Sequence, residues 1–263
     1  MQIWAIANQK GGVGKTTTTA ALGALMAEDG MRVLLVDMDP HASLSGYFSM
    51  EDLSGMGSVY ELFREHNPPA IASLARHTRY QGLSLLPAAA PMATLDRQLA
   101  LRQGTGRILG NALAMLGDSF DYVLLDCPPM LGLLMVNALV AAQLLLIPTQ
   151  TEALALDGLD RMQHSMQMIE RSMGRVLPRW IVPTMYDADT LHGRSVLMTM
   201  RERYRHLVTR NVIAVDPQIC EASQHGQPLS RWPAARQSAD SYHALLYELL
   251  GVDAKPARVR HER

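Results

Sequence analysis

The sequence is poor in the residues that mark disulfide-bonded, zinc-stabilised and strongly basic proteins. It contains two cysteines, Cys127 and Cys220, which lie far apart and form no CxxC pair. This argues against a disulfide framework or a structural zinc site and fits a reducing cytoplasm. The formal net charge is -1, which disfavours a strongly cationic nucleic-acid binder but still allows a local basic patch. Hydrophobic residues make up 48% of the 263 residues, enough to build a full core.

Signals for secretion and for membrane insertion are also lacking. The chain opens MQIWAIANQ without a basic segment, so no signal peptide is expected. The longest apolar run, residues 131–148, approaches the length of a membrane span, but Asn137 and Gln143 interrupt it. We therefore expect a short helix and then a buried strand over this run. After Gly251, Pro256 breaks any amphipathic membrane-targeting helix, so no membrane contact is expected.

Short apolar runs alternate with helical stretches along the chain. The expected strands are residues 2–7, 32–37, 83–87, 122–126, 144–148 and 179–184. A helix is expected to follow the first strand and to end at Gly30. This alternation predicts the α/β class, with one doubly wound, mostly parallel sheet covered by helices on both faces. We expect a single domain over residues 1–250 and a flexible tail over 251–263.

The stretch NQKGGVGKTT, residues 8–17, is typical of a phosphate-binding loop. Its glycines allow successive backbone N–H groups to face phosphate oxygens, and the following helix adds its positive N-terminal end. Lys15 is expected to reach the β- and γ-phosphates of ATP, and the Thr16 hydroxyl to ligate Mg²⁺. The residues expected to bind the nucleotide here are Gly11, Gly12, Val13, Gly14, Lys15, Thr16 and Thr17.

Three aspartates end apolar strands at the same edge of the predicted sheet as this loop. Asp126 is expected to assist magnesium together with Thr16. Asp37 and Asp39 are two residues apart, so their side chains are expected to point the same way. One of them is expected to contact metal-bound water and the other to orient the attacking water. We assign Asp37 to the metal and Asp39 to the attacking water, although the sequence leaves these two roles open. Met185 is a candidate for packing near the nucleotide base, although core packing explains it equally well.

Five stretches, in order, resemble the deviant Walker A ATPases of the ParA/Soj group, which is related to MinD. They are KGGVGKTTT, VLLVDMDPHAS, DYVLLDCPPMLG, LLLIPTQTEALALDGL and VPTMYDADT, and the resemblance runs from residue 1 to about residue 250. It implies ATP and Mg²⁺ as cofactors and an ATP-dependent homodimer. In that family the lysine matching Lys10 reaches the partner's phosphates, where a cation offsets charge in the transition state. It also implies catalytic roles for Lys15 and Asp39.

The chain departs from the family pattern where the family commonly carries DNA-binding arginines. Those positions are Asp189, Val215 and Gln218, so non-specific DNA binding is expected to be possible but weakened. Arg194, Arg201 and Arg205 are spaced to share one helix face and to compensate in part. A solvated helix face explains the same spacing.

The resemblance implies a cytoplasmic, nucleoid-associated or polar protein that positions or segregates intracellular cargo. The cargo would be chromosome or plasmid DNA or, in the branch that the stretches IWAIANQKGGVGKTTT and VDMDPHASLSGYF resemble, polar chemotaxis arrays. Hydrolysis would be slow, stimulated by an adaptor that is ParB-like or belongs to the arrays, and would reset the dimer. The alternative is a nucleotide-dependent polar scaffold with little turnover, against which the presence of Lys10 and Asp39 argues.

Overall fold

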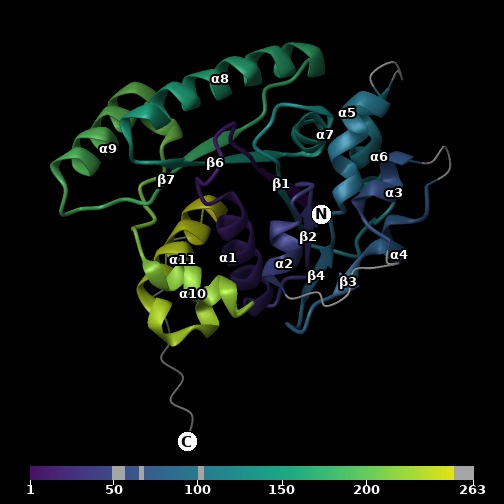
Figure 1. Ribbon diagram of the computed structural model, residues 1–263, viewed down its shortest axis with the longest axis horizontal. Helices are drawn as coiled ribbons and strands as arrows, with labels where there is room; N and C mark the ends of the chain where they lie inside the picture. Colours follow the sequence, from purple (N-terminus) through teal and green to yellow (C-terminus); the bar gives the residue numbers. More distant parts are fainter. Residues whose placement is uncertain (49–56, 65–67, 100–103, 252–263) are drawn as a thin grey trace, which may run out of the picture.

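The computed structural model describes residues 1–48, 57–64, 68–99 and 104–251, and its strands form one seven-stranded sheet. The strand order is β3-β4-β2-β5-β1-β6-β7, with all neighbours parallel except β3 and β4 (Figure 1). The strands are β1 (Gln2–Ile6), β2 (Val33–Asp37), β3 (Arg76–His77), β4 (Leu83–Leu86), β5 (Tyr122–Asp126), β6 (Leu144–Gln150) and β7 (Arg179–Thr184). The α/β class and all six expected strands are confirmed. The short antiparallel edge strand β3 was not predicted.

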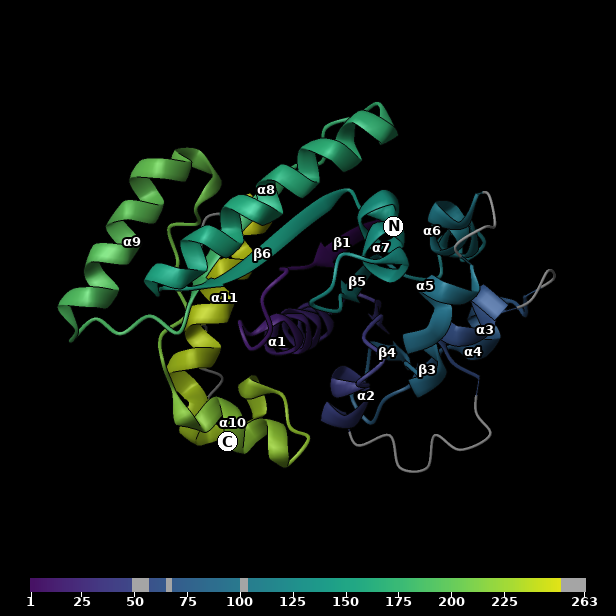
Figure 2. The same ribbon diagram turned by 45° about the horizontal axis from the view of Figure 1, so that its top comes forward.

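Helices cover both faces of the sheet, as predicted (Figure 2). One face packs against α1 (Lys15–Glu28), α2 (Ser43–Tyr47), α10 (Pro217–Gln224) and α11 (Arg236–Leu250). The other packs against α3 (Val59–Arg64), α4 (Ile71–Leu74), α5 (Leu95–Gln98), α6 (Ile108–Ala114), α7 (Leu133–Ala141), α8 (Ala153–Met173) and α9 (Leu191–Tyr204). Short 3₁₀ helices link them: η1 (Ala90–Thr94), η2 (Thr105–Arg107), η3 (Arg205–Leu207), η4 (Leu229–Arg231) and η5 (Pro233–Ala235).

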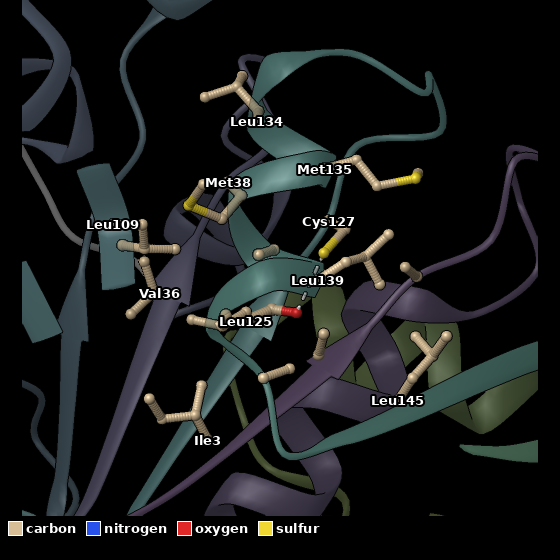
Figure 3. Packing of buried hydrophobic residues seen from close by; sticks show 14 of the residues in the cluster. Ile3, Val36, Met38, Leu109, Leu125, Cys127, Leu134, Met135, Leu139 and Leu145 are labelled. Atoms are coloured by element: carbon tan, nitrogen blue, oxygen red, sulfur yellow. Dashed lines mark hydrogen bonds between the residues drawn. The ribbon is translucent and has the colours of Figure 1, made fainter. Parts of the chain in front are cut away.

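Each central strand divides its side chains between two buried clusters. In β1, Ile3 and Ala5 join one cluster, while Trp4 and Ile6 join the other. This follows from the period of two along a strand and explains why a strand covered on both faces is a continuous apolar run in sequence. The cluster under α6 and α7 includes Cys127, which is fully buried (Figure 3).

The helix boundaries follow local signals in the sequence. Gly14 (φ +86°) precedes α1. Gly30 (φ +88°) follows it, and the N–H of Met31 donates to the carbonyl of Met26. This matches the glycine-terminated helix end that was predicted. The apolar run 131–148 forms α7 and then β6, also as predicted, and within the described residues no helix has both the length and the apolar character needed to cross a membrane.

The arginines near the end of α9 differ in part from the prediction. Arg205 does not share a helix face with Arg194 and Arg201, because α9 ends at Tyr204 and Arg205 turns the chain with φ +47°. Arg194 and Arg201 do line one shallow pocket beside Met198. Of the predicted tail, residues 252–263 lie outside the described part of the chain.

Candidate functional site

The glycine loop leaves β1 at the carboxyl edge of the sheet, between β5 and β6. Gly12 (φ +72°) and Gly14 (φ +86°) adopt the left-handed backbone conformation that favours glycine. A Cβ atom at Gly11 or Gly12 would meet nothing within 4 Å. The loop therefore borders open space on the side where backbone N–H groups and the start of α1 are available to an anion.

Hydrogen bonds to β6 and β7 hold the loop in place. Thr184 Oγ1 donates to the carbonyl of Val13 (3.0 Å), and Asn8 Nδ2 donates to the carbonyl of Pro148 (2.7 Å). Lys15 Nζ donates to the carbonyl of Lys10 (3.1 Å), and Lys15 is 8% exposed. Burial lowers the pKa of Lys15, while the nearby Asp126 carboxylate acts in the opposite direction.

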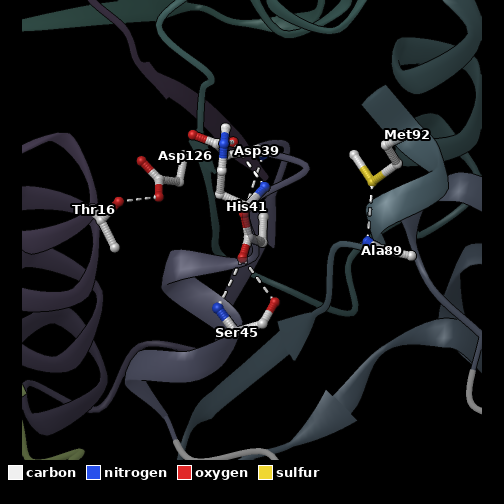
Figure 4. Close-up of polar contacts among 8 residues, drawn as sticks. Thr16, Asp39, His41, Ser45, Ala89, Met92 and Asp126 are labelled. Carbon is white, nitrogen blue, oxygen red and sulfur yellow. Dashed lines mark hydrogen bonds and ion pairs between the residues drawn. The ribbon is translucent and has the colours of Figure 1, made fainter. Parts of the chain in front are cut away.

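Thr16 and Asp126 meet beside the loop and fit a magnesium site. Thr16 Oγ1 donates to Asp126 Oδ2 (2.7 Å), while the buried Asp126 Oδ1 has no hydrogen-bond partner (Figure 4). Burial raises the pKa of Asp126 well above its ordinary value, and the neighbouring Asp37 adds to this. No cluster of three or more His, Cys, Asp and Glu side chains is found in the described residues. Mg²⁺ needs no such cluster, because it is commonly held by one or two protein oxygens, water and substrate phosphates.

Asp37 and Asp39 make different contacts, although they are two residues apart. Asp37 is fully buried; its Oδ2 accepts hydrogen bonds from Ser45 N (2.8 Å) and Ser45 Oγ (2.7 Å), and its Oδ1 accepts one from Asp39 N (3.1 Å). Burial raises the pKa of Asp37 to about 6. Asp39 is 15% exposed, and His41 bonds only one of its carboxylate oxygens, Oδ1. Asp39 thus keeps an oxygen free for water, whereas both Asp37 oxygens have protein donors.

Lys10 is held by its own chain at the mouth of the loop. Its Nζ donates to Gln150 Oε1 (2.5 Å) at the end of β6 and lies 3.2 Å from Glu152 Oε2, just before α8. Gln150 also donates to the carbonyl of Gly12 (3.3 Å). Sequence reasoning missed Gln150 and Glu152. The signal was present in PTQTE, where polar side chains follow an apolar strand.

Met185 lies on the same side of the site. It is 41% exposed, has φ +52°, and its Sδ is 3.0 Å from Gln150 Nε2, the atom that also contacts the loop. This position is compatible with packing near a base, which stays a prediction.

A glycine loop between a β-strand and a helix N-terminus, with a lysine and a threonine at its end and an aspartate on the adjacent strand, defines a P-loop nucleotide-binding protein. Comparisons with known proteins narrow this class. A family model described as "AAA domain" matches residues 1–178. The sporulation initiation inhibitor protein Soj of Bacillus subtilis is 32% identical over 94% of this chain and 98% of its own length. The chromosome partitioning protein ParA of Myxococcus xanthus is 32% identical over 96% of this chain and 89% of its own.

A solved structure with the same fold as this chain supports this class. The cobyrinic acid a,c-diamide synthase of Mycobacterium smegmatis, with bound ATP analogue and magnesium, has a TM-score of 0.79, 33% identity, and coverage of 98% of this chain and 99% of its own. On these matches the chain belongs to the ParA/Soj-like family of P-loop ATPases.

Proposed function

We propose that this chain is an ATP- and Mg²⁺-dependent, dimerising ATPase that positions or segregates cargo inside the cell. The observation that carries this proposal is the grouping of Lys15, Thr16, Asp126 and Asp39 around an open glycine loop with Lys10 at its mouth. The chromosome partitioning function named for the Myxococcus relative supports the cargo role. The ATP analogue and magnesium in the Mycobacterium structure support the choice of cofactors.

Each residue has a role in this proposal. Backbone N–H groups of residues 11–17 and the Lys15 ammonium would bind the phosphates, and Thr16 with Asp126 would hold Mg²⁺, with the Asp37 carboxyl nearby. When bound, the metal would supply positive charge against the negative charge of the phosphates. Asp39, with its free oxygen, orients the attacking water. Lys10 leaves Glu152 and reaches the partner's phosphates.

Apolar side chains exposed beside the site support a dimer through this edge of the sheet. Met130 and Leu131 follow β5, and Leu154 lies in the first turn of α8, after β6. Their exposed fractions are 75%, 40% and 76%. Exposed apolar groups next to a charged site are typical of a surface that a second protein covers.

The proposed partners are a second copy of the chain and an activating adaptor, either ParB-like or part of a chemotaxis array, with slow turnover that the adaptor stimulates. DNA is proposed as a weak partner, because Arg203 already pairs with Asp160, and Arg210 lies 3.7 Å from Glu248. We propose a cytoplasmic location, on the nucleoid or at the cell poles, and a single ATPase domain over residues 1–250.

The decisive experiment measures association and turnover together. Asp39→Ala protein with ATP and Mg²⁺, measured by size-exclusion chromatography with light scattering, is expected to be a dimer. The Asp39→Ala/Lys10→Ala protein is expected to stay monomeric, and Lys10→Ala alone to lose nearly all turnover. Arg32→Ala is the control, since Arg32 pairs with Asp121 at the opposite edge of the sheet.

A strictly monomeric ATP-bound Asp39→Ala protein at high concentration would contradict the proposal. Dimerisation with equal turnover in wild type and Asp39→Ala would favour the nucleotide-dependent scaffold instead.

A further inference from the structure

His41 makes two contacts to one oxygen of Asp39. The backbone N–H of His41 donates to Asp39 Oδ1 (3.0 Å), and the ring Nδ1 lies 2.8 Å from the same atom (Figure 4). The chain turns tightly here, because the N–H of Ala42 donates to the carbonyl of Asp39 (2.8 Å) and Ala42 has φ +55°. This turn brings the imidazole of His41 back to the carboxylate.

The contact determines which carboxylate oxygen of Asp39 can accept a hydrogen bond from water. A carboxylate only accepts hydrogen bonds, so Nδ1 must carry the proton and act as the donor. Within the described residues no side chain or backbone group donates to Asp39 Oδ2. His41 therefore occupies Oδ1 and fixes the plane of the carboxylate, with Oδ2 left to accept a hydrogen bond from water.

The position of His41 separates this contact from nucleotide binding. His41 is 83% exposed and, within the described residues, its hydrogen bonds are to Asp39 alone. No hydrogen bond or ion pair joins it to the loop residues 11–17, all of which the structure describes. Removing its ring would leave Asp39 Oδ1 held only by the backbone N–H of residue 41, so the carboxylate plane would be less restrained while the phosphate-binding groups stay in place.

We propose that His41 is a positioning residue for hydrolysis, whose Nδ1–H holds Asp39 in the orientation that directs Oδ2 to the attacking water. This inference rests on the proposed function, in which Asp39 orients that water. In this proposal His41 acts through Asp39 and touches neither the attacking water nor the phosphates. Its loss should therefore lower kcat and leave KM for ATP nearly unchanged.

The chemistry of asparagine and glutamine allows an atom-by-atom test. The Nδ2 of asparagine is bonded to Cγ, as is Nδ1 of histidine, whereas the amide nitrogen of glutamine lies one bond further out. Steady-state ATPase assays are expected to give a kcat about five- to tenfold lower for His41→Ala, the loss expected for one exposed hydrogen bond to a charged group. His41→Asn should stay within about twofold of wild type, and His41→Gln should resemble His41→Ala.

The controls separate this inference from the proposed function. His164→Ala removes an exposed histidine of α8 and should leave kcat unchanged. In an Asp39→Ala background, His41→Ala should have no further effect, because its partner is gone. Equal kcat for wild type and His41→Ala, or for His41→Asn and His41→Ala, would overturn the role of His41. An inactive wild type, or one unaffected by Asp39→Ala, would overturn the proposed function itself.

Discussion

At the scale of single residues, two neighbouring buried carboxyl groups are unfavourable to ionise. Asp37 and Asp126 end adjacent strands in register, and both are buried. Burial raises the pKa of Asp37 from 3.8 to about 6, and that of Asp126 well above its ordinary value. A bound Mg²⁺ would stabilise the charged forms. The site thus favours a cation in addition to the nearby Lys15 ammonium.

This arrangement predicts how the stability of the nucleotide-free protein depends on pH. Because the folded state holds the Asp37 proton more tightly than the unfolded chain, the free energy of unfolding should fall as pH rises from about 4 to about 6. A shift of about two pKa units corresponds to roughly 3 kcal/mol, and Asp126 acts in the same direction. Urea denaturation at a series of pH values measures the change.

Two variants test the source of this pH dependence. Asp37→Asn should show a clearly smaller decline over that window. Asp121→Asn should keep the full decline, because the Arg32 guanidinium lowers the pKa of Asp121 to about 2, below the window. A wild-type protein whose stability rises with pH between 4 and 6 would show that these carboxyls are not buried as described.

The sequence suggested candidate phosphate-site residues more readily than the residues that support them. Lys15, Thr16 and Asp126 were predicted because a loop motif and a strand end identify them locally, and the structure brings them close together. Gln150 contacts Lys10 across 140 residues of chain. Such a contact depends on β6 lying beside β1, and a pattern of apolar runs does not give strand order. The contact between His41 and Asp39 is local, since the two residues are two positions apart. It depends on a backbone turn that composition does not reveal.

At the scale of elements, the start of α9 is a close-packed helix cap. Thr190 Oγ1 accepts a hydrogen bond from the N–H of Gly193 (3.1 Å). A Cβ atom at Gly193 would lie 2.5 Å from the carbonyl oxygen of Asp187 and 2.9 Å from Thr190 Oγ1. This explains a glycine inside a helix, where it is ordinarily unfavourable.

Gly193→Ala should therefore destabilise the protein, by about 1–3 kcal/mol, because the cap and the preceding turn must shift. Gly158→Ala in α8 is the matched control. Its Cβ would lie 3.7 Å from Arg161 Nη2, an ordinary contact, so alanine should be neutral or stabilise by up to about 1 kcal/mol. Urea unfolding curves of both variants measure the difference. Equal effects in the two helices would exclude the steric explanation.

The elements that the sequence did not predict lack a local signal. β3 has only two residues, Arg76 and His77, and pairs at a sheet edge without an apolar run. The end of α9 at Tyr204 is set by the positive φ of Arg205, a conformation that arginine rarely adopts, so periodicity alone extended the helix too far. The six buried strands were predicted because burial on both faces requires continuous apolar sequence.

At the scale of the whole molecule, the surface near α9 is expected to limit affinity for DNA. Asp189 and Val215 are exposed, and Val215 is 58% accessible. Wild-type protein with ATP should bind DNA weakly in gel shifts and lose binding as salt approaches the physiological range. The Asp189→Arg/Val215→Arg protein should bind more tightly and with a steeper salt dependence. Asp118→Arg is the control, because it also adds positive charge but at the opposite edge of the sheet.

Tight wild-type binding at physiological salt, or an equal gain from Asp118→Arg, would contradict this explanation. The first result would mean that other cations replace the family's arginines. The second would mean that overall charge, and not this surface, sets the affinity.

The hydrogen bond from Lys15 to the carbonyl of Lys10 bears on what happens between two turnovers. In the structure the ammonium group has an acceptor within its own turn of chain, and Thr16 has Asp126 as its partner. These contacts support the loop from within the same chain. On the proposed function, an incoming triphosphate would replace one set of partners by another, which would lower its net binding energy and favour its release in each cycle.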